Sequence, residues 1–445
     1  MQKKSHKLDK LKRSAMAVLD KNTLEGLVIP AQGLYPHRVL WDSCFIAIGL
    51  SNYDLKKAKR QISEYLKAQW SDGMVPHIIF NPQPKYWWDR HLWRSYISPN
   101  SVKKLSTSGL TQPPMLAEAV TAIGFKLPKE EKQVWYESNI NHLIRYHAWL
   151  YENRDPKGDG LITLIHPWET GLDNTPPWLV SLRHQHAPWW INLMTWLKLD
   201  KLGDHLRVDN HYVDYRQRST TIEALRLYDA MRLIRKAKYS RLKVLNKPTF
   251  AVADLAYNSI FIRANTLLRQ MAEEIGIKLP SELLENMKKS EQALEKLWDS
   301  KLESYFSQNV KHNYLLLEDS VSGLLPLYSG VISPERAKKL VEKIKDSTLF
   351  NTKYPLPSVP INSKWFKPMR YWQGPTWLNI NWLVINGLKQ YGFSNEAERL
   401  RDLSIELVEK NGFYEYFNPL DGTPAGVKDF SWTAALIIDL IETES

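Results

Sequence analysis

Apolar residues recur at helical spacing in one segment after another of this 445-residue chain, and loops separate the segments. Residues three and four positions apart lie on one face of an α-helix, so this spacing predicts amphipathic or buried helices. No sustained alternation of apolar and polar residues, the pattern typical of strands, interrupts them. The sequence therefore predicts an all-α fold. We expect helices near residues 1–22, 45–50, 55–70, 115–124, 132–151, 190–202, 222–237, 251–276, 281–299, 334–346, 376–391, 396–410 and 432–441.

Segments dense in aromatic and polar residues recur at alternate helix junctions. A barrel of helices places every second loop at the same end, so these segments are expected to converge on one funnel-shaped site. Most of the 18 tryptophans are explained by core packing. A tryptophan in a short polar loop, however, more often lines a cleft than fills a core. The segments lie near residues 35–45, 69–77, 111–114, 166–178, 370–377 and 413–419.

Composition excludes several classes of protein. The net charge of +12 permits contact with nucleic acid, but the lysines are spread over probable helix faces, which favours a solvated surface. The single cysteine, Cys44, excludes an internal disulfide framework. The N-terminus is basic and has no apolar segment, so we expect no secretory signal. The chain contains no run of 18 apolar residues, so we expect no membrane span. We expect a cytoplasmic protein without nucleic-acid or membrane partners; the oligomeric state is not indicated.

The stretch from His166 to Trp178 carries two carboxylates, Glu169 and Asp173, among tryptophans. Its glycine, asparagine and prolines predict a loop rather than a long helix or a strand. Apolar rings around a carboxyl group raise its pKa, which makes it a general acid near neutral pH. Because flat sugar faces also stack on indole rings, the stretch predicts a site that cleaves sugars. The histidines within 203–221 lack the spacing of a zinc site, so we expect no metal and no other cofactor.

Five segments, in order between about residues 30 and 440, resemble glycoside hydrolase family 63. They are Leu40–Ser43, Thr111–Pro114, His166–Trp178, Trp372–Trp377 and Phe413–Tyr416. Within that family the chain is similar to the small bacterial enzymes that act on mannosylglycerate and glucosylglycerate. The resemblance implies an (α/α)6 barrel, here a single domain over residues 1–445 with loop insertions near 81–111 and 203–221. It also implies inverting hydrolysis of an α-glycosidic bond.

The resemblance further implies that Asp173 is the general acid and Glu415 the general base. Inversion needs a protonated carboxyl and a carboxylate on opposite faces of the substrate, roughly 6.5–9.5 Å apart. Glu169 is too near Asp173 in sequence to act from the opposite face, so we expect it to bind sugar hydroxyls or to support the loop. The structural alternative for Glu415 is a buried ion pair with Arg370 or a lysine.

Further residues are expected to bind the substrate. A carboxylate, amides and indole rings suit the hydroxyls and the flat faces of a hexose, although each residue also has a structural interpretation; Asp42, for example, could cap a helix. A glycerate carboxylate would need a cation or several donors, for which His77, Arg216 and Arg218 are candidates. The predicted substrate-binding residues are Tyr35, Trp41, Asp42, Gln69, His77, Gln112, Trp168, Glu169, Arg216, Trp372, Gln373 and Trp377.

The sequence departs from the resemblance in two places and leaves other functions open. Relatives often carry arginine where Pro177 stands, so this chain lacks one polar contact near the acid. The insertion at 203–221 and the Trp-rich stretch 84–96 would shape the side that binds the leaving group. We expect a hydrolase of a small α-glucoside or α-mannoside, glucosylglycerate or mannosylglycerate above all. The alternatives are an α-glucosidase for oligosaccharides or trehalose-like disaccharides, a phosphorylase, an inactive sugar-binding protein and an RNA-binding protein.

Overall fold

Six helices in the described part of the chain form a closed ring, in which each helix packs against the next and the last packs against the first. The computed structural model describes residues 2–184, 188–197, 207–240 and 250–443. The ring helices are mostly buried because they carry apolar residues on all faces. They are α2 (Leu40–Leu50), α5 (Leu116–Phe125), α12 (Leu255–Glu274), α14 (Pro326–Ser329), α16 (Leu378–Gln390) and α18 (Ser431–Glu442).

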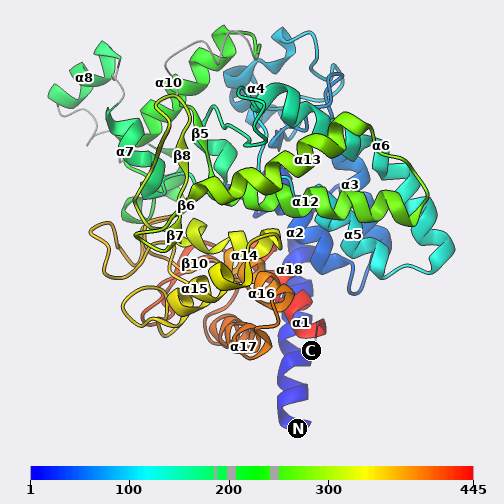
Figure 1. The fold of residues 1–445 in the computed structure, drawn as a ribbon. Coiled ribbons are helices and arrows are strands. Elements are labelled where there is room, and N and C mark those ends of the chain that lie inside the picture. Colours follow the sequence, from blue (N-terminus) through cyan, green and yellow to red (C-terminus); the bar gives the residue numbers. More distant parts are fainter. Residues whose placement is uncertain (1, 185–187, 198–206, 241–249, 444–445) are drawn as a thin grey trace.

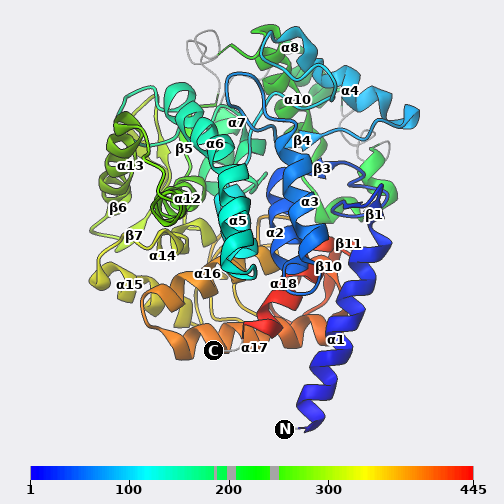
Figure 2. The same cartoon turned by 90° about the vertical axis from the view of Figure 1, so that its right-hand side faces the viewer.

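A second layer of helices surrounds the ring, and each outer helix packs on at least one inner helix. These helices are amphipathic, with one buried stripe and a polar outer face, as in α3, where Ala58, Ile62 and Leu66 are buried. Figure 2 shows α1 and α3 on the outside of α18 and α2. The outer helices are α1 (Gln2–Lys21), α3 (Leu55–Leu66), α6 (Lys129–Arg154), α13 (Ser281–Leu294), α15 (Pro334–Lys345) and α17 (Ser394–Asn411). The two layers confirm the predicted all-α, (α/α)6 fold.

Two long excursions leave the barrel at the same end, opposite the end at which the N-terminus lies (Figure 1). The first, between α3 and α5, contains helix α4 (Trp87–Trp93). A loop was predicted there, because the aromatic residues of this segment do not form an apolar stripe. The second, between α6 and α12, is much longer than the predicted insertion at 203–221, whose residues 203–206 lie outside the described residues. The excursion helices are α4 (Trp87–Trp93), α7 (Pro176–His184), α8 (Trp189–Trp196) and α10 (Thr221–Lys236).

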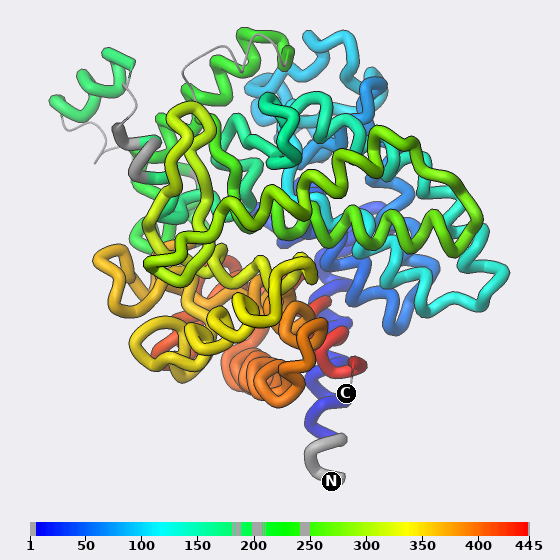
Figure 3. Tube along the Cα trace, viewed as in Figure 1, coloured from blue at the N-terminus to red at the C-terminus, as the bar shows by residue number. Residues whose placement is uncertain are grey.

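The predicted helices mostly agree with the structure, but α4, α7 and the ring helix α14 were not predicted, and α3, α8 and α13 end earlier than expected. The stretch around Asp173 is a loop, as predicted, but α7 begins inside it at Pro176, where the missing N–H of proline costs nothing. Helix α8 ends at Trp196, earlier than expected, and residues 198–202 of the predicted helix lie outside the described residues. The path of the chain brings α1 beside α18, so segments from the two ends of the sequence pack together (Figure 3). None of the described helices is long and apolar enough to cross a membrane.

Short antiparallel strands connect the helices, and two pairs of them frame the site. Strand β3 (Arg38–Val39) pairs with β4 (Ile78–Ile79), and β10 (Tyr414–Phe417) pairs with β11 (Pro424–Lys428). Strand β3 leads directly into α2, and β11 is followed by α18, so each pair lies where a ring helix begins. The remaining strands are β1 (Thr23–Leu24), β2 (Leu27–Val28), β5 (Val252–Ala253), β6 (Trp298–Asp299), β7 (Ser304–Tyr305), β8 (Gln308–Asn309) and β9 (Tyr314–Leu315).

Candidate active site

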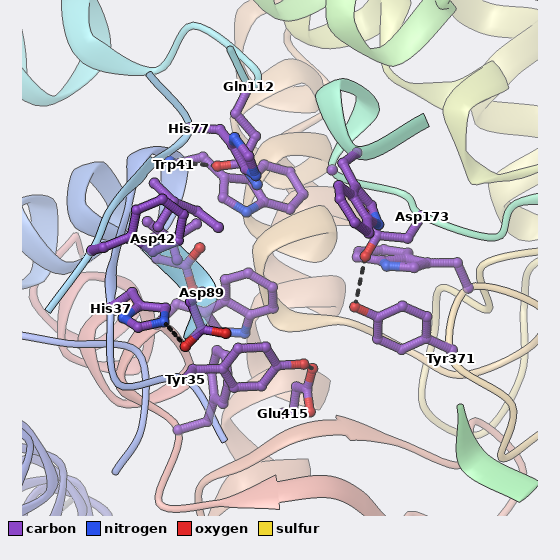
Figure 4. A pocket seen from close by; sticks show the side chains of 18 of the residues that line it. Tyr35, His37, Trp41, Asp42, His77, Asp89, Gln112, Asp173, Tyr371 and Glu415 are labelled. Atoms are coloured by element: carbon purple, nitrogen blue, oxygen red, sulfur yellow. Dashed lines mark hydrogen bonds and ion pairs between the residues drawn. The ribbon is translucent and has the colours of Figure 1, made fainter. Parts of the chain in front are cut away.

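A pocket of about 270 Å³ opens at the end of the barrel from which the excursions rise. The ring helices α2, α5, α16 and α18 begin around it, so their N-terminal segments supply much of its wall. Figure 4 shows Asp173 with Tyr371 across the pocket from His37 and Asp42. The fold thus brings together residues from all six of the predicted dense segments. The predicted site residues that line the pocket are Tyr35, Trp41, Asp42, His77, Gln112, Trp168, Asp173, Trp372 and Glu415.

Asp173 lies in the loop between the 3-10 turn Pro167–Thr170 and α7. Gly171 makes the turn with φ +72°, and a Cβ there would lie 2.7 Å from the indole of Trp41, so only glycine permits this approach. The pKa of Asp173 is raised to about 6, chiefly by burial and to a lesser extent by the charge of Glu415, whereas the hydrogen bond from Tyr371 and the charge of Arg218 lower it. A carboxyl with this pKa still holds its proton in a fraction of molecules near neutral pH.

Tyr371 is the partner of Asp173 and was not among the predicted site residues. Its hydroxyl donates a hydrogen bond to Asp173 Oδ2 at 3.0 Å. Its backbone has a φ of +40°, which is strained for a residue with a side chain, and its N–H is held by the carbonyl of Gln217 at 3.1 Å. The residue lies in the predicted dense segment 370–377, but sequence spacing could not show that its hydroxyl would point toward Asp173.

Glu415 is the second carboxylate of the pocket, and it is 2% exposed. Tyr35 donates its hydroxyl to Glu415 Oε1 at 2.8 Å, Arg218 forms an ion pair with it at 3.2 Å, and the N–H of Val427 donates to Oε2 at 3.1 Å. The register of β10 and β11 shifts at this residue, which indicates a bulge that redirects a side chain. A Cβ at position 426 would lie 2.5 Å from Glu415 Oε2, so only glycine lets strand β11 run this close to the carboxylate.

The structural alternative predicted for Glu415 was an ion pair with Arg370 or a lysine, but its partner is a different cation. Arg370 pairs with Glu223 at 3.4 Å, and Arg218 takes the place beside Glu415. Arg218 was proposed from the sequence as a ligand for glycerate. Its guanidinium also lies 4.4 Å from the ring centroid of Tyr371, so one cation contacts the base candidate and the partner of the acid candidate.

Asp42 is a third carboxyl of the pocket and lies in the first turn of α2. The residue at the N-cap position of α2 is Val39, so the interpretation of Asp42 as the helix cap is wrong. Burial raises the pKa of Asp42 well above its ordinary value, and the charges of Glu415 and Asp173 raise it further. Three carboxyl groups that share one pocket cannot all be ionised without mutual repulsion.

Indole rings form the apolar walls of the pocket. The ring of Trp41 lies 6.4 Å from that of Trp372 and 5.6 Å from that of Trp432. Trp377 stacks on the back of Trp372, with ring centroids 3.8 Å apart and an interplanar angle of 5°, and is 1% exposed. The prediction that Trp377 contacts the substrate is therefore wrong, because Trp372 stands between it and the pocket.

Two predicted amide ligands also lie behind the pocket wall. Gln69 donates to the carbonyls of Gly73 and His142, each at 2.9 Å, and accepts from the His142 ring at 2.6 Å. Gln373 donates to the carbonyl of Asn174 at 2.9 Å, which holds the loop next to Asp173. Neither lines the pocket, so both predictions of substrate contact are corrected to structural roles.

Glu169 and Arg216, both predicted to bind the substrate, lie outside the pocket. Glu169 is fully buried, pairs with Arg154 at 2.9 Å and accepts from the N–H groups of Ile165 and Thr111, which agrees with the supporting role and not with sugar binding. The side chain of Arg216 is 74% exposed and pairs with Asp214 at 2.6 Å, away from the pocket. Arg216 is therefore no ligand for glycerate in this conformation.

His77 lines the pocket, but as a neutral ring. Its pKa is lowered to about 3, chiefly by burial and also by the nearby His166. Its Nδ1 lies 2.6 Å from the hydroxyl of Ser108. A histidine with this pKa is uncharged at neutral pH, so of the two predicted roles, cation or hydrogen-bond donor, His77 fits only the second.

Several lining residues escaped the sequence analysis. His37 and Asp89 form a pair at 3.2 Å on the wall opposite Asp173 (Figure 4). His37 belongs to the dense segment 35–45 and Asp89 to the predicted insertion 81–111, and local sequence pattern could not show that these two side chains would pair. The other lining residues without a prediction are Val39, Ile78, Phe80, Trp93, Gly171, Phe430 and Trp432, besides Tyr371.

A barrel of two helical layers, with acidic and indole side chains at the end where its long loops gather, is the architecture of a glycoside hydrolase. Residues 35–433 match the family described as mannosylglycerate hydrolase MGH1-like glycoside hydrolase domain. The chain belongs to this family within glycoside hydrolase family 63, as the resemblance of its motifs indicated.

Individual relatives extend over almost the whole chain. A mannosylglycerate hydrolase of Rubrobacter radiotolerans is 32% identical over 98% of this chain and 97% of its own length. A glucosylglycerate hydrolase of Mycolicibacterium hassiacum is 28% identical over 96% of each chain. The crystal structure of a family 63 mannosylglycerate hydrolase of Thermus thermophilus, in complex with Tris and D-glycerate, superposes with a TM-score of 0.86 at 33% identity, over 98% of this chain and 100% of that one.

Proposed function

We propose that the protein hydrolyses a small α-glycoside of glycerate, mannosylglycerate or glucosylglycerate, with inversion at the anomeric carbon. The observation that carries the proposal is the unlike setting of two carboxyls in one pocket. Asp173 has a raised pKa and a neutral hydroxyl partner, whereas Glu415 is paired with a guanidinium. Relatives named for hydrolysis of these two substrates support the choice of the leaving group.

In this proposal Asp173 is the general acid. Protonated Asp173 donates its proton to the glycosidic oxygen as the bond to the anomeric carbon breaks, so the leaving glycerate departs as an alcohol. The hydroxyl of Tyr371 bonds to Oδ2 and thereby leaves the other carboxyl oxygen to face the substrate. The same hydroxyl stabilises the carboxylate that forms when the proton has left.

Glu415 is the general base in this proposal. It holds a water on the far side of the sugar and accepts its proton as the oxygen attacks the anomeric carbon. Tyr35, Arg218 and the N–H of Val427 fix the orientation of the carboxylate, so the water is held at a defined position. Attack from the face opposite the leaving group inverts the anomeric configuration.

The shape of the pocket favours a small substrate over the alternatives. A volume of about 270 Å³ lies below the roughly 300–1,000 Å³ of sites for drug-sized ligands, which favours a monosaccharide with a small leaving group over an oligosaccharide. Indole rings offer flat faces to the sugar, and Asp42 and Gln112 offer polar groups to its hydroxyls. A phosphorylase would use phosphate in place of the water and would not require Glu415 as a base.

The test is the anomer that forms first. Incubation with α-mannosylglycerate and with α-glucosylglycerate, each with and without phosphate, is followed by proton NMR from the first minute. We expect the β-hexose as the initial product and no requirement for phosphate. Asp173→Asn and Glu415→Gln should each abolish turnover, whereas Asp421→Asn, an exposed carboxylate in the turn between β10 and β11, should not. An α-hexose, a sugar phosphate or an active Glu415→Gln variant would contradict the proposal.

A further inference from the structure

A second cavity, of about 380 Å³, lies behind one wall of the pocket. The shared wall is the pair of strands β3 and β4. Successive side chains of a strand point to opposite faces, and here Val39 and Ile78 line the pocket whereas Arg38 and Ile79 line the second cavity. The hairpin of β1 and β2 and the outer helix α3 close the far side. The two cavities are therefore separated by the thickness of one two-stranded ribbon.

The second cavity is lined by more cations than anions. Among the residues that the structure describes, none of these cations forms an ion pair with a carboxylate. Four positive and two negative groups leave an excess of two positive charges, which a dianion would neutralise. The cations are Arg38, Arg60, Arg90 and Lys104, and the carboxylates are Glu25 and Glu64.

The partners of these groups leave donors open to a ligand. Arg60 and Arg90 donate to backbone carbonyls at 2.9 Å and 2.7 Å, and Arg38 approaches a carbonyl only at 3.5 Å. Each guanidinium has five N–H donors, so these bonds use a minority of them. Glu64 pairs with Lys67 outside the cavity at 2.7 Å, which reduces its hold on the arginines. A guanidinium group can donate two parallel N–H···O hydrogen bonds to two oxygens of one phosphate group.

A line of hydrogen bonds crosses the wall from this cavity to the pocket. Arg90 donates to the carbonyl of Asn81, and the N–H of Asn81 donates to His37 Nδ1 at 3.1 Å. His37 Nε2 meets Asp89 Oδ2 at 3.2 Å inside the pocket (Figure 4). Asp89 and Arg90 are neighbours on α4, one lining each cavity. A ligand that moved Arg90 would therefore reach His37 and Asp89, which lie on the wall opposite Asp173.

We propose that this cavity is a second ligand site, that it takes inorganic phosphate or a small phosphate monoester, and that its occupancy alters substrate binding through Asn81 and His37. The phosphate group is the shared chemistry of both ligands. Arg38, Arg90 and Lys104 hold its oxygens. The bond between Arg90 and the carbonyl of Asn81 weakens when the guanidinium turns to the anion, and His37 and Asp89 shift in the pocket wall.

The binding test uses the full chain and two probes, inorganic phosphate and glycerol 3-phosphate, in calorimetric titrations at an ionic strength held constant with chloride. We expect saturable binding of at least one probe, and the stronger one identifies the source of the phosphate. Arg90→Gln and the exposed Lys104→Gln should each raise the Kd about tenfold, because each removes a charge-assisted contact. Lys103→Gln is the matched control, since it removes a neighbouring exposed charge that does not line the cavity.

The absence of saturable binding in the unchanged protein would overturn the proposal, as would a Kd that changes equally in Lys103→Gln and Lys104→Gln. The coupling is tested by the KM for the glycoside, which should shift about fivefold with phosphate, reach a plateau and lose this shift in Lys104→Gln. A KM that rises linearly without a plateau would place phosphate in the active-site pocket and refute the second site. The titrations need no turnover, so their outcome is independent of the proposed hydrolysis.

Discussion

Replacing Tyr371 by phenylalanine removes one hydroxyl and leaves the aromatic ring in place, so it tests the role of Asp173 as the acid. The hydroxyl donates to Asp173 Oδ2 at 3.0 Å and lowers the pKa of that carboxyl, whereas burial raises it, and the pKa that results is about 6. Loss of the bond therefore raises the pKa further. A hydrogen bond to a charged group contributes ~1.5–3 kcal/mol, which corresponds to about 1–2 pKa units.

The consequence appears on the alkaline side of the pH profile. The acid must be protonated in the free enzyme, so the alkaline limb of kcat/KM reports its pKa. At pH 7 a pKa of about 6 leaves roughly one tenth of the Asp173 carboxyls protonated, and a pKa near 7.5 leaves roughly three quarters. We expect the alkaline limb of Tyr371→Phe to lie about 1–2 pH units above that of the unchanged protein, while the acidic limb stays in place.

The assay is hydrolysis of α-mannosylglycerate at closely spaced pH values between about 4 and 9, with kcat/KM determined at each. Tyr354→Phe is the matched control, because its hydroxyl donates to Glu406 at 3.4 Å, outside the pocket, and has no bond to Asp173. The control should leave the alkaline limb unchanged. An active Tyr371→Phe variant whose alkaline limb does not move, or moves to lower pH, would refute the assignment of Asp173 as the acid whose pKa Tyr371 sets.

Three further predictions concern the charges around the pocket. The pKa of Asp173 is higher in the folded chain than its ordinary value of 3.8, so its ionisation costs stability as pH rises through about 6; Asp173→Asn should raise the free energy of unfolding in urea by about 1–3 kcal/mol at pH 8 and by nothing at pH 4. Arg218→Met leaves the buried carboxylate of Glu415 without its cation, and we expect the free energy of unfolding to fall by ~3–5 kcal/mol and kcat to fall at least ~100-fold. Unchanged turnover would exclude Arg218 as the residue that positions Glu415. Glu169→Gln leaves Arg154 without its buried partner and should lower stability by ~3–5 kcal/mol with an unchanged KM, and a strongly raised KM would restore Glu169 as a sugar ligand.

The sequence predicted the parts of the molecule that local pattern determines. Apolar spacing located the helices of both layers except α14, because burial of one face decides whether a helix forms and the four residues of α14 are too few to show a helical pattern. The glycine- and proline-rich loop predicted that Asp173 would lie in a turn, and the short extended piece at Glu415 is strand β10. The excursion helix α4 was missed because Trp87 and Trp88 are exposed, at 54% and 58%, so no apolar stripe marks it.

The contacts within the site were beyond the reach of sequence. Arg218 and Glu415 are 197 positions apart, and only the closed ring brings them together. Gln69 and Gln373 have the chemistry of sugar ligands, but backbone carbonyls beside them take their donors first. Arg216, two residues before Arg218, turns to its neighbour Asp214 instead. Which of these two arginines turns toward Glu415 is decided by backbone direction, and composition carries no information about it.

The closure of the helical ring has a kinetic consequence. Asn52, just after α2, donates to Asp439 in α18 at 3.0 Å across 387 positions of sequence, and the wall of the pocket is incomplete until these two helices meet. Contacts so distant in sequence form late, because loop closure costs chain entropy before any packing offsets it. During synthesis the apolar faces of the helices from α2 to α16 stay partly exposed until α18 has left the ribosome. We therefore expect catalytic activity to be the last property that a refolding or newly made chain acquires, after its helical content is already complete.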